Sequence, residues 1–123
     1  FEDEKIKMRI IRTFFFEIKQ LKNCISFVKE YENEVKKYVI IDLNNYVCEK
    51  VKNCSDNAEY ILKNISHELL NKETIDFIGN IFIENTKDIK SLDFFIDKIK
   101  QSEKLTTSYE YLIRQNPNQS GNP

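Results

Sequence analysis

The chain has 123 residues, the usual size of a single domain with one hydrophobic core. Its 19 Lys and Arg residues balance 20 Asp and Glu residues, so the net charge of -1 argues against a nucleic-acid partner, which would need a basic surface. With 41% hydrophobic and 32% charged residues, and no apolar run near the roughly 18 residues that span a bilayer, the composition is typical of a soluble globular protein.

Turn-forming residues are scarce, because the chain has two Gly and two Pro and none of them occurs before Gly79. Tight β-turns depend on these residues, so a sheet with many hairpins is not expected. We predict an all-α fold: a compact bundle of four to six helices with a long first helix. The expected domain is 1–114, followed by a flexible tail at 115–123 that contains both prolines.

Apolar residues recur at spacings of three and four from about residue 4 to residue 38, which predicts one long helix that could bend near Lys22. One stripe consists of Ile10, Phe14, Leu21, Cys24, Val28, Tyr31, Val35 and Tyr38. A second stripe beside it consists of Ile11, Phe15, Ile18 and Ile25. Together they would give the helix a wide apolar face.

The later elements are shorter, and Asn, Asp and Ser separate them. We predict, in chain order, a helix at 40–52, a turn at 53–55, a helix from 55 or 56 to about 70, a helix capped by Thr74, a helix opened by Ser91 and a short amphipathic piece at 109–113. No repeat of fixed period and no second composition regime appears, so one domain is expected.

Two of the three cysteines, Cys48 and Cys54, are six positions apart. In a continuous helix they would be about 9 Å apart along the axis, whereas a disulfide needs Cα atoms within about 7 Å. A bridge is therefore possible only if the helix ends between them, near the predicted turn at Asn53. Two separate thiols remain an alternative, and a metal site is disfavoured because the spacing is unusual and the only histidine is distant. We expect the disulfide, with Cys24 as a free, buried thiol. Intermolecular pairing or a reactive thiol is the alternative for Cys24.

Catalytic chemistry has no visible basis in this sequence. The single histidine, His67, lies on the polar side of its predicted helix, and there is no glycine-rich loop, nucleophile set or metal-ligand spacing. We predict that the protein is not an enzyme and uses no cofactor and no metal.

Some apolar residues exceed what one core can bury. Phe14, Phe15 and Phe16 cannot all face the same core, and Phe77 and Ile83 lie off the stripe of their helix. Surplus exposed apolar groups can mark a contact surface, so we assign lipid or partner contact to Phe14, Phe16, Phe77 and Ile83. The alternative is that another helical segment or the tail covers them.

Three Asn-x-Ser sequons make Asn53, Asn64 and Asn118 glycosylation candidates and favour a secreted or secretory-pathway location. The abundance of Asn, Ile and Lys is also typical of an AT-rich genome, which raises the number of sequons by chance. A cytoplasmic location is the alternative.

Three motifs between Leu21 and Phe82 resemble a known family: "LKNCISFVKEY", the segment from "LNNYVC" to "NC", and "AEYILKNISHELLNKETIDFIGNIF". They are similar to the saposin-like family, small helical proteins that bind or perturb lipids and carry six cysteines in three bridges. Three of the six positions are cysteines here. The resemblance implies one retained bridge, between Cys48 and Cys54, and an orphan Cys24 whose partner position is Asp76. It implies lipid contact and no catalytic residues.

Two functions follow from these observations. The first is a non-enzymatic, secreted helical domain that binds lipid or contacts membrane surfaces through apolar helix faces. The second is a helical protein-protein interaction module, and the apolar stripe from Leu21 to Tyr38 supports it. Such a module could form a homodimer or act as a ligand for a host or partner receptor.

Overall fold

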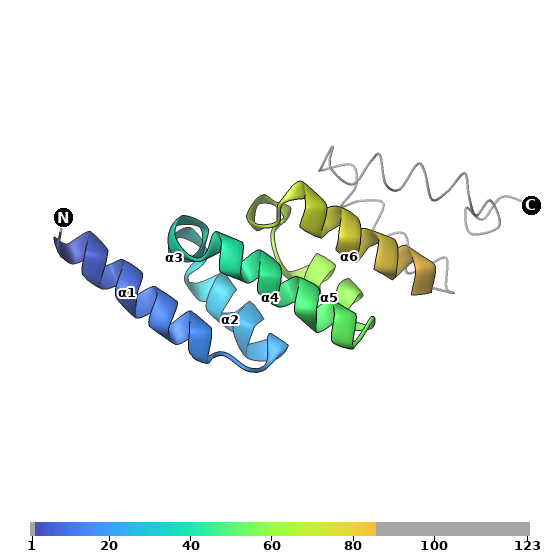
Figure 1. Ribbon diagram of the computed structural model, residues 1–123, viewed down its shortest axis with the longest axis horizontal. Coiled ribbons are helices and arrows are strands. Elements are labelled where there is room, and N and C mark those ends of the chain that lie inside the picture. Colours follow the sequence, from blue (N-terminus) through green and yellow to red (C-terminus); the bar gives the residue numbers. More distant parts are fainter. Residues whose placement is uncertain (1, 86–123) are drawn as a thin grey trace, which may run out of the picture.

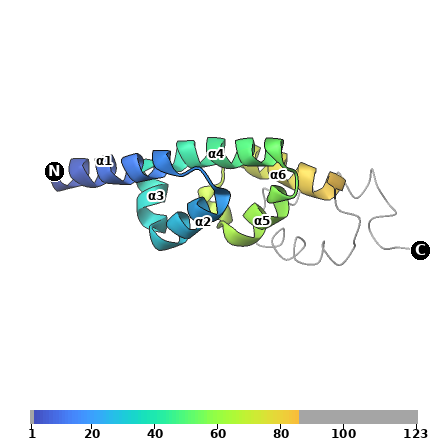
Figure 2. The same cartoon turned by 90° about the horizontal axis from the view of Figure 1, so that it is seen from below.

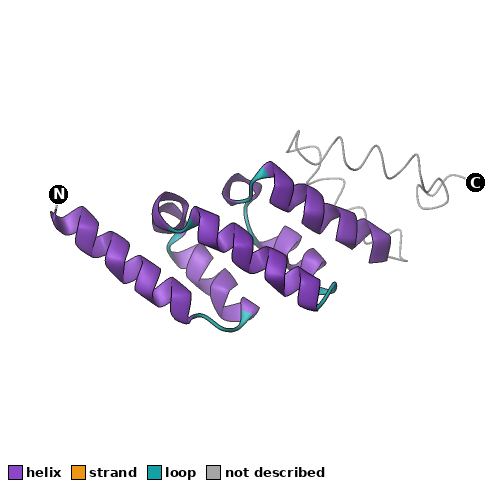
Figure 3. Cartoon of the chain, in the orientation of Figure 1, coloured by secondary structure: helices purple, strands orange, loops and turns teal. Residues whose placement is uncertain are grey.

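The computed structural model describes residues 2–85, and these residues form helices joined by short loops, with no strand among them (Figure 3). The elements are α1 (Glu2–Glu17), α2 (Leu21–Glu30), α3 (Glu32–Tyr38), α4 (Ile40–Asn53), α5 (Asn57–Asn64), a 3₁₀ turn (His67–Leu69) and α6 (Lys72–Asn85). The all-α class is confirmed. The helix predicted from Ser91, the piece at 109–113 and the tail at 115–123 lie outside the described residues.

The helices form two layers (Figure 2). Seen from the edge, α1, α4 and α6 follow one another in one layer, and α2, α3 and α5 form the other. Helix α1 packs mainly on α3, whereas α4 and α5 both pack on α6. As a result α1 lies at the end of its layer that is farthest from α6 (Figure 1).

The expected long first helix is wrong, because residues 4–38 form three helices instead of one. A short loop separates α1 from α2, and Tyr31 alone separates α2 from α3, with backbone angles of φ -120° and ψ 40°. The Val35 N–H still bonds to the Tyr31 carbonyl at 2.8 Å, so this junction changes the chain direction while keeping most of the hydrogen bonds. Folding back lets each segment bury its own apolar face, which one straight helix could not do in a chain of this size.

The predicted helix at 40–52 is confirmed as α4, and the turn after it lies at residues 55–56, slightly later than the predicted 53–55. The predicted helix from 55 to 70 is shorter than expected, since α5 ends at Asn64 and Ile65 adopts extended angles (φ -111°, ψ 130°). The side chain of Ser66 then accepts a hydrogen bond from the Glu68 N–H at 3.3 Å and opens the 3₁₀ turn.

The start of α6 also differs from the prediction. Asn71, and not Thr74, caps this helix, because the Asn71 Oδ1 accepts the Thr74 backbone N–H at 2.8 Å. Thr74 is buried inside the first turn. An Asn at this position satisfies one of the backbone N–H groups that a helix leaves unpaired at its start.

One apolar core runs through both layers, with contributions from every helix. Its buried members are Ile11, Phe15, Leu21, Cys24, Ile25, Val28, Val35, Val39, Leu43, Val47, Val51, Ala58, Ile61, Leu62, Ile65, Leu69, Leu70, Ile75, Ile78, Phe82 and Ile83. None of the helices in the described region has the length and apolar character that a bilayer span requires.

Candidate binding surfaces on α1 and α4

Helix α1 buries only one of its two apolar stripes. Ile11 and Phe15 are 6% and 3% exposed, and the Phe15 ring lies 6.3 Å from Phe27 of α2 and 5.9 Å from Tyr46 of α4. Within α1 the other stripe, at Ile10 and Phe14, faces solvent, although its continuation in α2 and α3 is largely buried. A helix at the end of a layer has neighbours on one side only, so the other apolar stripe stays uncovered.

The exposed stripe consists of Ile6, Ile10 and Phe14, which we call the α1 ridge. Their side chains are 53%, 47% and 57% exposed, and the spacing of four residues places them on one face of the helix. Five of the eight large apolar side chains exposed in the described residues belong to α1: Ile6, Met8, Ile10, Phe14 and Phe16. Such a concentration of exposed apolar groups is typical of a contact surface.

Cations accompany the α1 ridge. From Lys5 to Phe16 the helix carries four cations, Lys5, Lys7, Arg9 and Arg12, and no anion. All four are exposed, and none forms a salt bridge within the described residues. The helical repeat places Lys7 and Arg9 on the two flanks of the ridge. The stretch from residue 5 to residue 16 is therefore basic and amphipathic, whereas four acidic residues at the two ends bring the net charge of the whole helix to zero.

Exposed polar contacts also link α1 to α3. The Glu4 carboxylate accepts hydrogen bonds from the Tyr38 hydroxyl and from the Lys37 ammonium, the latter at 2.9 Å. The Tyr38 and Lys37 hydrogen bonds hold the pKa of Glu4 below its usual value. Together with the buried Ile11 and Phe15, these contacts hold α1 against the remainder of the fold.

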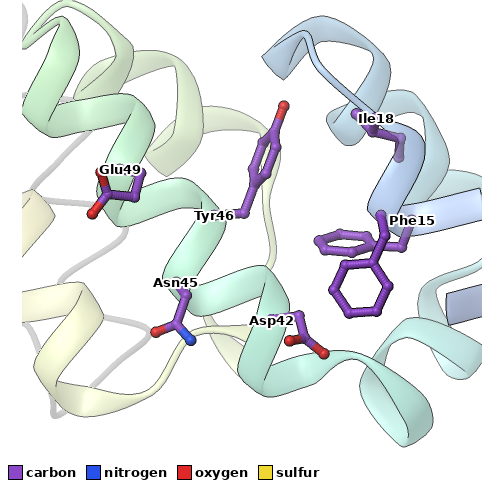
Figure 4. Close-up of a pocket in the computed structure, with 7 residues that line it drawn as sticks. Phe15, Ile18, Asp42, Asn45, Tyr46 and Glu49 are labelled. Atoms are coloured by element: carbon purple, nitrogen blue, oxygen red, sulfur yellow. The ribbon is translucent and has the colours of Figure 1, made fainter. Parts of the chain in front are cut away.

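A groove lies between the end of α1 and α4, and we call it the α1–α4 groove (Figure 4). Its volume is about 320 Å³, and it is open to solvent. It is lined by Phe15, Phe16, Ile18, Asp42, Asn45, Tyr46 and Glu49. In Figure 4 the side chains of Phe15, Ile18 and Tyr46 form its apolar part, and the polar side chains of Asp42, Asn45 and Glu49 follow one another along α4.

Two residues assigned to a contact surface lie elsewhere. Ile83 is 3% exposed and belongs to the core, so its assignment to lipid or partner contact is wrong. Phe77 is half-buried and packs against the core, with the Lys52 Nζ 5.9 Å from its ring centroid. Phe14 and Phe16 are exposed, and both lie on α1.

The expected disulfide is not formed, because all three cysteines are free. Helix α4 continues through Lys52 to Asn53, and the Cys54 N–H bonds to the Lys50 carbonyl at 3.1 Å. Cys48 is half-buried with its Sγ 3.8 Å from the Thr74 Oγ1, whereas Cys54 is exposed. Cys24 is a free, buried thiol as expected, and burial raises its pKa to about 12.

The remaining polar candidates are separate from these surfaces. Asn53 is exposed at the end of α4, and Asn64 accepts a hydrogen bond from the Lys29 Nζ at 3.1 Å and donates to the Tyr60 carbonyl at 2.8 Å. Asn118 lies outside the described residues. His67 is half-buried in the 3₁₀ turn, and residues 2–85 hold no group of three or more His, Cys, Asp and Glu side chains placed to bind a metal.

Sequence reasoning missed two parts of these surfaces. The spacing of Ile6, Ile10 and Phe14 was visible, but a stripe of this kind looks the same whether it is buried or exposed. The acidic side of the groove was not predicted, because Asp42 and Glu49 meet Phe16 only after the chain has folded back.

Comparisons of the chain with family models, with curated proteins and with solved structures find no match. The resemblance to the saposin-like family therefore stays a prediction.

Proposed function

We propose that this protein is a non-enzymatic helical domain that contacts an anionic membrane surface through the α1 ridge and the cations beside it. The observation that carries the proposal is the exposure of Ile6, Ile10 and Phe14 on a helix whose central part is purely cationic. Basic amphipathic helices with exposed Ile, Phe or Leu are typical of surfaces that lie in the lipid headgroup region.

The energetics favour reversible binding. Burying the exposed parts of three large apolar side chains contributes about 1 kcal/mol each, and a Lys or Arg near an anionic lipid surface contributes about 1 kcal/mol. These contributions are small individually, and the electrostatic part decreases with salt. The expected association is therefore weak, salt-dependent and specific for anionic lipid.

Further support comes from the sequence. The resemblance to the saposin-like family implies lipid contact, and the three sequons favour a secretory location. The free cysteines remove the disulfide as support for that location, which rests now on the sequons alone.

Co-sedimentation with vesicles tests the proposal. We expect the protein to sediment with vesicles of phosphatidylcholine and phosphatidylserine and to stay in solution with phosphatidylcholine alone. The double variant Ile10→Gln, Phe14→Gln should no longer sediment with the vesicles. In the double variant Lys7→Gln, Arg9→Gln, phosphatidylserine should no longer increase the sedimented fraction. The matched control is Ile41→Gln on α4, because Ile41 is 73% exposed and lies outside the ridge.

Two results would contradict the proposal. One is a wild-type protein that ignores the anionic vesicles, and the other is a control variant that loses as much sedimentation as the ridge variant. A protein that self-associates in sedimentation velocity, and whose ridge variant is monomeric, would instead identify the ridge as a protein-protein interface.

A further inference from the structure

We infer that the α1–α4 groove is a docking site for a protein segment in which a Lys or Arg side chain lies beside an apolar one. This site is distinct from the α1 ridge, because it faces α4 and its charges are of the opposite sign. The inference rests on the shape of the groove, its apolar part and the position of its carboxylates.

The apolar part of the groove is built from side chains that the core holds in place. Phe15 is buried, and its ring meets those of Phe16 and Tyr46 at 6.0 and 5.9 Å with steep interplanar angles of 77° and 65°. Ile18 packs against the core just after the end of α1. These contacts pack the floor of the groove against the core and leave an apolar surface that another apolar side chain can contact.

The size of the groove limits the occupant. A volume of about 320 Å³ lies at the lower end of the range of ligand pockets, enough for one or two side chains. The polar side continues along α4 from Asp42 to Glu49, which is about 10 Å or two helical turns. A peptide segment that presents side chains on successive turns matches this length.

The charge of the groove selects a cationic occupant. Asp42 is half-buried in the first turn of α4 and forms no salt bridge within residues 2–85. Glu49 is exposed, and its contact with the Lys52 Nζ at 3.4 Å is an exposed pair of the kind that exchanges readily with another cation. Asn45 between them adds an exposed amide.

The cations near the groove are already engaged. The Lys50 Nζ donates to the Lys19 carbonyl at 2.6 Å and lies 5.3 Å from the Tyr46 ring, and the Arg12 guanidinium lies 5.9 Å from the Phe16 ring. Neither cation lines the groove, and Asp42 and Glu49 are the charged side chains among its lining residues. A Lys or Arg stem can cover the apolar floor while its charged end reaches a carboxylate, and an anionic lipid headgroup would be repelled.

Peptide binding tests the inference. The probe is a fluorescein-labelled amphipathic helix made of Leu and Lys, compared with a helix of the same length and pattern made of Leu and Glu. We expect fluorescence anisotropy to show binding of the Lys peptide only, with weaker binding at higher salt. The variant Asp42→Asn, Glu49→Gln should bind the Lys peptide roughly tenfold more weakly.

A matched control separates this site from general attraction to acidic groups. The variant Glu73→Gln, Glu84→Gln removes the same charge from exposed positions on α6 and should bind as the wild type does. A third variant, Ile18→Gln, should also weaken binding, because it makes the floor polar while both carboxylates remain. In NMR spectra, the amide shifts caused by the peptide should concentrate between residues 42 and 49.

Three results would overturn the inference: no binding of the Lys peptide, equal loss in the α6 control, or amide shifts centred away from the groove. The ridge variant Ile10→Gln, Phe14→Gln should keep its affinity for the peptide. The docking inference and the membrane proposal are therefore tested on different variants, and a failure of one can be told apart from a failure of the other.

Discussion

Asn44, in the middle of α4, is hydrogen-bonded to Asn71, the residue that caps α6. The Asn44 Oδ1 accepts the backbone N–H of Asn71 at 2.9 Å. The Asn44 Nδ2 donates to the Leu69 carbonyl at 3.0 Å and to the Ile40 carbonyl at 2.7 Å. Asn71 in turn caps α6 by accepting the N–H of Thr74. One buried side chain thus connects α4 to the 3₁₀ turn and to the first turn of α6.

This connection predicts a large effect for Asn44→Ala. The substitution would leave the buried Leu69 carbonyl and the partly buried Asn71 N–H without their partner, at about 3 kcal/mol of unfolding free energy. Urea denaturation followed by circular dichroism measures the loss. Asn45→Ala, at an exposed neighbouring position, should change the free energy of unfolding by less than about 0.5 kcal/mol. Equal effects of the two variants would show that the network does not stabilise the fold.

The two adjacent phenylalanines of α1 should differ in the same assay. Phe15→Ala removes a buried ring that contacts α2 and α4, and we expect it to lower the free energy of unfolding by about 3 to 4 kcal/mol. Phe16→Ala removes a ring that is 52% exposed and should cost less than about 1 kcal/mol. If both variants lost a similar amount of unfolding free energy, α1 would not pack on the other helices through Phe15 as described above.

The contacts of Glu4 predict a pH effect at both ends of the scale. Hydrogen bonds from Tyr38 and Lys37 lower the pKa of Glu4 from its usual value of 4.5. The contact of the ionised Glu4 with α3 therefore stabilises the fold fully above pH 4.5, and this stabilisation is lost as the pH falls through the folded-state pKa. The pKa of Lys37 is raised from 10.5, mainly by the hydrogen bond to Glu4, so its contribution is lost as the pH rises through the folded-state value.

Glu4→Gln checks this effect. The difference in unfolding free energy between wild type and variant should be constant near neutral pH and should decrease below pH 4.5. A two-dimensional NMR titration of the Glu4 side chain in the wild type should give a pKa below 4.5 directly. A Glu4 that titrates at its ordinary value would mean that the contact with α3 is absent in solution.

The cysteines should react in the order of their exposure. Without reductant, the denatured protein should give three thiols, because none of them is bridged. In the folded protein at about pH 8, Cys54 should react with a thiol reagent first, and Cys24 should stay unreactive because burial raises its pKa to about 12 and the thiolate is the nucleophile. Cys54→Ser supplies the control, since it should remove the fast phase. A count of one thiol would indicate the bridge that α4 excludes here.

Helix α4 and the turn after it could be predicted from the sequence, and the breaks within residues 4–38 could not. The end of α4 is marked locally by Asn53 and Ser55, which favour turns. Tyr31 and Val39 separate helices without any Gly or Pro, and only the packing of α2, α3 and α4 explains why the chain bends there. The prediction of one continuous helix followed the local signals, which tertiary contacts override.

The sequence by itself determined that the protein is helical and that its apolar residues exceed one core, because scarce Gly and Pro and three-and-four spacing are local properties. Only the tertiary structure decided which apolar residues are in excess. Ile10 and Ile11 are neighbours in the sequence with equal helix propensity, yet Ile11 is buried and Ile10 is exposed. Their fates differ because the other helices cover one side of α1, and no local pattern records which side that is.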